Sequence, residues 1–147
     1  MVDVAAKGRT GTEFGMEIER GKIREFAAAI GSVNPAYLAD PAPVSPATFL
    51  TTMVFWQSED ADPWREVRMD PTRGLHAEQE FIFHGPPPRA GDKLTCRSRI
   101  EDIYDKEGRR GRLTFAVMVT EFRDETGRLV AEARLTGVET AGLGEPS

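Results

Sequence analysis

Two histidines, His76 and His84, are the only side chains in this sequence of 147 residues whose ordinary pKa lies near neutral pH. Glu78 follows His76 by two residues, and residues at positions i and i+2 of a strand share a face. A carboxylate can orient an imidazole, so His76 and Glu78 could act as a surrogate general base and its orienting group. The interpretation that we favour is a structural strand histidine that hydrogen-bonds across a subunit interface.

A second stretch with chemical potential is residues 30–37, which read IGSVNPAY. Gly31 can end a helix in a left-handed cap, and Pro35 keeps Asn34 out of the helical region. The sequence therefore predicts a rigid polar loop, and such loops often carry binding and catalytic groups. Asn34 could bind a ligand or only stabilise an Asx-type turn. Tyr37 could donate a hydrogen bond to a ligand or pack with its hydroxyl at the rim of a pocket.

Two apolar segments must position this loop. The first is a helix that begins near Glu19 and ends at Gly31, predicted from apolar residues at helical spacing: Ile23, Phe26, Ala27 and Ile30. The second is a helix over residues 46–57, with Ser45 as its N-cap and Pro46 as its first residue. It is apolar on nearly every side, which predicts burial. Some of its large side chains could line an acyl-sized tunnel, although core packing is expected for most of them: Phe49, Met53, Phe55 and Trp56.

Residues 58–73 are charged and interrupted by proline, which predicts a surface loop. Trp64 and Val67 could anchor this loop or line the mouth of a pocket. After Gly74 the apolar residues alternate, and four strands are expected at residues 75–84, 93–104, 112–122 and 129–138. Leu113, Phe115, Val117 and Val119 are expected to share the apolar side of the third strand. The last three strands form an antiparallel meander joined by glycine-containing hairpin loops.

An apolar sheet face needs a cover, and the helix at 46–57 is the most apolar one available. The expected fold is therefore α+β, a single hot-dog fold in which a curled antiparallel sheet wraps a central apolar helix. Residues 1–147 are expected to form one domain, with residues 1–11 and 141–147 flexible. Open edge strands favour pairing with a second copy or a homologous subunit.

Composition narrows the function classes. The net charge of -5 argues against a nucleic-acid or anionic-membrane partner. No apolar run reaches the roughly 20 residues that span a bilayer. The single cysteine, Cys96, fits a reducing compartment, so the expected location is the cytoplasm. One Cys and two His cannot supply the usual zinc ligands, and no metal site is expected.

The loop at residues 30–37 resembles the signature loop of MaoC-type (R)-specific enoyl-CoA hydratases and 3-hydroxyacyl dehydratases, which reads roughly Ser/Thr-Gly-Asp-x-Asn-Pro-hydrophobic-His. The order of features also resembles the N-terminal MaoC-like (FAS1-like) dehydratase domain: this loop, the apolar helix after Pro46, the His76-x-Glu78-Gln79 strand and the Gly91-Asp92 turn. The resemblance covers roughly residues 12–140. It implies acyl-CoA or acyl-carrier-protein thioesters as substrates and no cofactor.

The departure from this family pattern concerns the catalytic dyad. Gly31, Asn34 and Pro35 match the family positions, whereas Ser32 stands at the Asp position and Tyr37 at the His position. A hydroxyl or a phenol with a pKa of about 10 is a poor base near neutral pH. Some heteromeric members, among them mycobacterial fatty-acid dehydratases and steroid side-chain hydratases, contain one half that has lost the dyad.

The resemblance therefore implies a dyad-free subunit that shapes the acyl pocket while a partner with intact Asp and His does the chemistry. In this interpretation Asn34, Tyr37, Phe49, Met53 and Trp56 contact the substrate. Two alternatives stay open. One is a self-sufficient homodimeric hydratase that uses His76 and Glu78. The other is a non-catalytic acyl-thioester-binding or scaffold protein.

Overall fold

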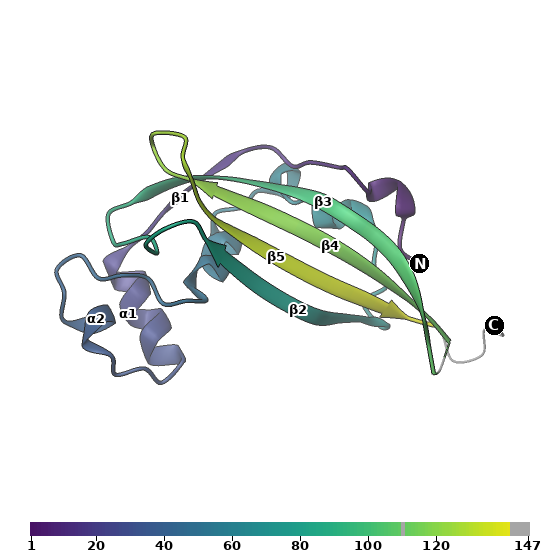
Figure 1. The fold of residues 1–147 in the computed structure, drawn as a ribbon, viewed down its shortest axis with the longest axis horizontal. Helices are drawn as coiled ribbons and strands as arrows, with labels where there is room; N and C mark the ends of the chain where they lie inside the picture. Colours follow the sequence, from purple (N-terminus) through teal and green to yellow (C-terminus); the bar gives the residue numbers. More distant parts are fainter. Residues whose placement is uncertain (110, 142–147) are drawn as a thin grey trace.

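A computed structural model describes residues 1–109 and 111–141 of the chain. Its main feature is a single curled antiparallel sheet of five strands in the order β1-β3-β4-β5-β2 (Figure 1). The strands are β1 (Phe14–Glu17), β2 (Gly74–Phe83), β3 (Lys93–Gly108), β4 (Gly111–Arg123) and β5 (Leu129–Thr140). The hot-dog sheet expected from the alternating apolar pattern is confirmed. The hairpin between β3 and β4 is tighter than predicted, because the two strands run on to pair Gly108 with Gly111.

The helix expected after Glu19 is α1 (Arg20–Ala29), which buries Ile23 and Ala27 as the spacing predicts. Gly31 follows with a φ of 69°, a left-handed conformation that glycine adopts without steric cost. A short helix, α2 (Pro35–Leu38), comes next and lies beside α1 at one end of the sheet (Figure 1). The ring of Phe26 meets that of Phe49 edge-on at 5.5 Å, which ties α1 to the segment that follows.

The structure of residues 46–57 differs from the expected helix in three ways. It is a 3-10 helix, η2 (Phe49–Phe55), and Ser45 does not cap it, because Val44 bridges to Arg89 and the Ser45 N–H donates to the Pro88 carbonyl. Its β-branched threonines and valine have low α-helical propensity. One side is buried through Phe49 and Leu50, whereas Val54 is 57% and Phe55 77% exposed. The prediction that this helix is buried on all sides is therefore wrong.

Residues 1–11, which were expected to be flexible, make defined contacts with the rest of the chain in this structure. This arm contains a short 3-10 helix, η1 (Val4–Ala6), and runs along β3. The Gly8 N–H donates to the Ile100 carbonyl at 2.9 Å, and Thr10 bridges to Arg99. Val2 and Ala6 are buried in the same apolar cluster as Val67, so the arm covers part of the inner side of the sheet at this end. Residues 142–147 of the expected flexible tail lie outside the described residues.

Two apolar clusters fill the concave side of the sheet, where the short helical turns of residues 49–67 lie behind the strands in Figure 1. The first joins η2 and α1 to the β1 end and includes Phe49, Leu50 and Phe122. The second joins η1 and η4 (Pro63–Val67) to the opposite end and includes Val2 and Val67. Another 3-10 turn, η3 (Glu59–Ala61), connects the two regions. None of the described helices is long and apolar enough to cross a membrane.

Candidate functional site

A cavity of about 260 Å³ lies between the two apolar clusters, against the concave face of the sheet. Met53 and Val54 of η2 form one wall, and Trp64 of η4 belongs to another. The floor is the sheet itself, through Met118, Thr120, Ala133 and Leu135. The rim is β2, which contributes His76, Gln79 and Phe81. Most of the lining surface is apolar, although six of the thirteen lining residues are polar, and such a chamber suits a flexible hydrocarbon chain.

A β-bulge in β2 separates His76 from Glu78. His76 pairs with Gly137 and Glu78 pairs with Thr136, so Ala77 is the extra residue between them. His76 lines the cavity, whereas Glu78 lies on the other face of the sheet, the face that also carries Glu80. The prediction that the two side chains share a face is wrong, because strand periodicity breaks at a bulge.

The His76 ring makes a local contact instead of one with the Glu78 carboxylate. Its Nε2 lies 3.1 Å from the backbone oxygen of Glu78. A carbonyl oxygen only accepts, so Nε2 is the donor in this contact. The arrangement holds the ring at the exposed rim of the cavity.

Trp64 is seated on a glycine of the sheet. A Cβ atom at Gly137 would lie 2.7 Å from Cζ2 of Trp64 and 3.1 Å from Cε of Met69. Only a residue without a side chain lets the indole approach β5 this closely. The sequence suggested two roles for Trp64, as an anchor and as a pocket-lining residue, and the structure gives it both positions.

The buried Ser98–Thr120 hydroxyl pair and the Cys96 thiol are not placed to take part in catalysis. The hydroxyls of Ser98 and Thr120 hydrogen-bond to each other at 2.8 Å, which satisfies a buried polar pair beside the cavity. Cys96 is fully buried, and burial raises the pKa of its thiol to about 12. A thiol held neutral in this way is not a nucleophile.

The loop at residues 30–37 is stabilised by its own side chains. Asn34 is the N-cap of α2, and its Oδ1 accepts a hydrogen bond from the Ala36 N–H at 3.0 Å. Ser32 Oγ accepts from the Asn34 N–H at 3.3 Å. Pro35 occupies the first helical position. The backbone of the loop is thus preorganised by local contacts.

The residues expected to contact substrate do not form one site in the described structure. Met53 lines the cavity, Phe49 lies in the core with 1% exposure, and Trp56 borders a separate shallow groove with Lys22 and Phe55. Asn34 is exposed, and Tyr37 packs partly buried against the first apolar cluster. Within the described residues, the cavity wall includes none of residues 30–37. Sequence patterns gave no signal for the cavity-lining polar residues Gln57, Asp62, Gln79 and Thr120.

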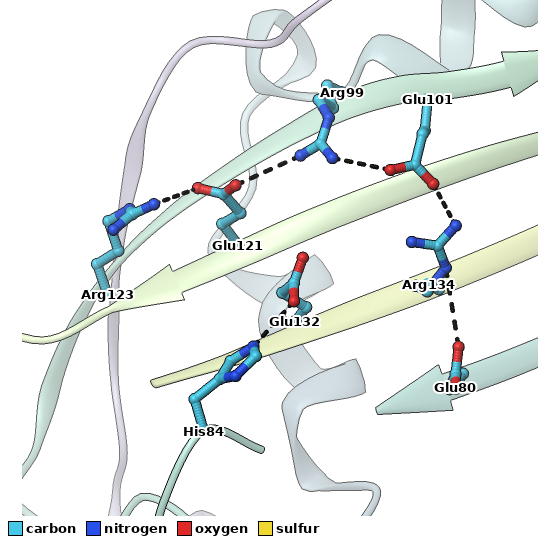
Figure 2. Close-up of polar contacts among 8 residues, drawn as sticks. All are labelled: Glu80, His84, Arg99, Glu101, Glu121, Arg123, Glu132 and Arg134. Atoms are coloured by element: carbon cyan, nitrogen blue, oxygen red, sulfur yellow. Dashed lines mark hydrogen bonds and ion pairs between the residues drawn. The ribbon is translucent and has the colours of Figure 1, made fainter. Parts of the chain in front are cut away.

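The convex face of the sheet carries a continuous ladder of charges, shown in Figure 2. Arg99 bonds Glu101 at 2.9 Å and Glu121 at 3.4 Å, and Arg134 links Glu101 to Glu80. The ladder continues from Glu121 to Arg123, and a separate pair joins His84 to Glu132 at 2.9 Å. Among the described residues, no group of three or more His, Cys, Asp and Glu side chains is placed to hold a metal ion.

Comparison with known families identifies the chain. The model of the FAS1-like dehydratase domain region matches residues 5–133, which is most of the sequence. The chain belongs to this family. Curated relatives include a UPF0336 protein of Streptomyces griseus, 32% identical over 80% of this chain and 80% of the relative. A UPF0336 protein of Streptomyces coelicolor is 37% identical over 63% of this chain, and the match spans 66% of that protein.

Solved structures of MaoC-like dehydratases share the fold. A truncated HadBC complex, a (3R)-hydroxyacyl-ACP dehydratase of Mycobacterium tuberculosis, matches with a TM-score of 0.71 and 27% identity over 92% of this chain and 97% of that one. The ChsH1–ChsH2 complex of the same organism has a TM-score of 0.71 at 17% identity, over 97% of this chain and 89% of that one. Another MaoC-like dehydratase has a TM-score of 0.76 at 22% identity, over 94% of this chain and 43% of that one.

Proposed function

We propose that this chain is the dyad-free subunit of a cytoplasmic, heteromeric (R)-specific enoyl-thioester hydratase or 3-hydroxyacyl-thioester dehydratase. A partner hot-dog subunit supplies the catalytic Asp and His, and this chain shapes the acyl pocket. One observation carries the proposal. The loop keeps the scaffold of its family through Gly31, Asn34 and Pro35, but Ser32 and Tyr37 occupy the dyad positions.

The chemistry explains why a partner is needed. Hydration of a conjugated thioester requires a base that takes a proton from water and an acid that returns one to carbon. The Ser32 hydroxyl oxygen accepts the Asn34 N–H and has no neighbouring imidazole in its loop. Such a hydroxyl is not activated for proton transfer. The general acid and base must then come from another chain.

The cavity supports the role assigned to this chain. Its apolar lining, with Met53, Phe81, Trp64 and Leu135, suits the hydrocarbon part of an acyl thioester on either coenzyme A or an acyl carrier protein. The resemblance to HadBC, a (3R)-hydroxyacyl-ACP dehydratase, supports the same substrate class at 27% identity. The bulge in β2 weighs against a self-sufficient hydratase built on His76 and Glu78, since the two side chains lie on opposite faces.

The test compares the chain alone with the chain in a complex. We expect crotonyl-CoA to be hydrated only at the uncatalysed rate when the purified chain alone is present. Co-expression with a hot-dog subunit that has an intact Gly-Asp-x-Asn-Pro-x-His loop should give a stable complex with hydratase activity. Asp→Asn in the partner loop should abolish it, while Ser32→Ala in this chain should leave it largely intact.

Two outcomes would overturn the proposal. Hydration at ordinary enzyme rates by the chain alone would show that it carries its own dyad. A complex that binds acyl-CoA but hydrates nothing, with every such partner, would instead favour the non-catalytic binding or scaffold protein.

A further inference from the structure

The cavity opens to solvent between η2 and β2. Its exposed lining residues are Thr51 and Val54 on η2 and His76 and Gln79 on β2. The lining residues that β4 and β5 contribute are buried or half-buried beneath them. A ligand that enters between the two elements therefore meets the concave face of the sheet and must extend along it.

The concave face beneath the cavity is a series of cross-strand pairs between β4 and β5, here called rungs: first Thr120–Ala133, second Met118–Leu135 and third Ala116–Gly137. The first and second rungs line the cavity, whereas neither residue of the third does. The indole of Trp64 takes that place, because a Cβ at Gly137 would lie only 2.7 Å from its Cζ2. The cavity floor therefore ends where Trp64 begins.

The end of the floor at Trp64 is its more apolar half. The first rung includes the hydroxyl of Thr120, whereas the second consists of Met118 and Leu135. Both residues of the second rung, together with Trp64, also pack in the second apolar cluster. Burial of hydrocarbon is most favourable against apolar surface, which favours an acyl tail that points towards Trp64.

The position of Trp64 is fixed by contacts within the chain. Asp62 caps η4, and its Oδ1 accepts a hydrogen bond from the Trp64 backbone N–H at 3.1 Å. The preceding Pro63 is buried, and so is Val67 at the end of the same turn. The indole itself rests on Gly137. A ring held in this way cannot move aside for a longer chain without disturbing a close-packed interior.

We propose that Trp64 sets the maximum length of the acyl chain that the cavity accepts, because it occupies the third rung of the floor. The cavity of about 260 Å³ holds roughly eight to ten methylenes, at about the 30 Å³ that a water molecule takes in the liquid. The substrate class is then a medium-chain acyl thioester. This inference rests on the proposed function in that it takes the ligand to be an acyl thioester.

Binding of saturated acyl-CoAs to the purified chain tests the length limit without hydratase activity. Each additional pair of buried methylenes should strengthen binding about tenfold, until the tail reaches Trp64 and the gain stops. We expect this break at roughly eight to ten carbons in the wild type. In Trp64→Ala the third rung adds about 7 Å of floor, so the break should move to chains longer by roughly four to six carbons. Isothermal titration calorimetry with even-numbered chains measures both positions.

A matched pair of milder substitutions decides the question if Trp64→Ala does not fold. Trp64→Phe keeps a ring at the third rung and should move the break by about half as much, because it frees less volume. Trp56→Phe makes the same change at the other tryptophan, which borders a separate groove, and should leave the break unchanged. In that protein Trp64 is the only indole. An acyl-CoA with bromine on its last carbon should quench its fluorescence most strongly at the length of the break.

The inference is overturned if the break stays in place in the folded Trp64 variants, if quenching does not depend on chain length, or if the chain binds no acyl-CoA. These results are separable from those for the proposed function. Hydration with a partner, combined with an unmoved break, would keep the proposed function and remove the role of Trp64. A break that moves with Trp64 in a chain that no partner activates would do the reverse.

Discussion

In the loop at residues 30–37, backbone geometry and chemical capacity are carried by different residues. Gly31, Asn34 and Pro35 hold a left-handed turn, a side-chain cap and a helix start. Each has a local cause, so the loop geometry could be predicted from the sequence. What a nearby ligand would meet depends on Ser32 and Tyr37, and under the proposed function a second chain supplies the proton chemistry that these two residues lack.

Trp64 and Gly137 form a close pair that sequence periodicity does not reveal. The indole touches the floor of the sheet only because position 137 has no side chain. We expect Gly137→Ala to destabilise the protein by about 1–3 kcal/mol, the usual cost of overpacking a filled interior. In a Trp64→Ala background the same change should cost much less, because the clashing ring is gone.

Urea denaturation of the four proteins in this double-mutant cycle measures the coupling. Gly15→Ala serves as the control, since a Cβ at that glycine would meet no atom within 4 Å. Equal costs of Gly137→Ala with and without the indole would contradict the proposed contact.

At the scale of elements, alternation predicted where the strands lie better than which side of them is buried. The third predicted strand, β4, was expected to face the core with Val117 and Val119. The structure places Ala116, Met118 and Phe122 in the apolar clusters instead. Val119 is nevertheless fully buried on the convex face, where it pairs with Arg99 and Arg134 of the charge ladder. Long arginine side chains cover apolar residues, which a two-state pattern of apolar and polar residues cannot anticipate.

Bulges add a second source of error. The register of β2 shifts between His76 and Glu78, and that of β3 shifts between Ile100 and Asp102. One extra residue moves every later side chain to the other face. The surrogate base pair was inferred from spacing across one of these shifts, which is why its geometry could not be predicted.

The turn between β4 and β5 has a carboxylate that should make stability depend on pH. The Thr126 hydroxyl, aided by the N–H groups of Arg128 and Thr126 and by the Arg128 guanidinium, holds the pKa of Asp124 at about 2. Its ordinary value is 3.8, so the folded state favours the charged form. The resulting stabilisation is complete above pH about 4 and is lost as the pH falls towards about 2.

We therefore expect Asp124→Asn to lower stability near neutral pH and to match the wild type more closely near pH 2. Thermal unfolding across this range measures the narrowing difference. Glu125→Gln is the control, because within the described hairpin its side chain makes none of these hydrogen bonds. A difference that stays constant with pH would show that Asp124 acts only through its turn geometry.

At the scale of the whole molecule, the cover of the sheet is assembled from short pieces. Residues 46–57 cover only part of the concave face through η2, and the rest is covered by η4 and the N-terminal arm. A segment of small and polar residues such as 1–11 carries no amphipathic signal, so sequence alone could not assign it to the core. The burial of Val2 and Ala6 depends on tertiary packing against the sheet and not on a local sequence pattern.

Val2 and Val4 provide a direct test of this packing. Val2 is 6% exposed in the second apolar cluster, whereas Val4, in the same arm, is 65% exposed. The arm is held at both sides of Val2, by the Asp3 N–H donating to the Val67 carbonyl at 2.9 Å and by the N-terminal amine 3.5 Å from Glu139. An aspartate at position 2 would therefore place an unpaired charge beneath the sheet.

We expect Val2→Asp to destabilise the protein by about 2–3 kcal/mol, and Val4→Asp to change stability by less than about 0.5 kcal/mol. Urea denaturation followed by tryptophan fluorescence reports the difference, since Trp64 packs against the same cluster. Equal stability of the two variants would mean that the arm does not contribute to the core.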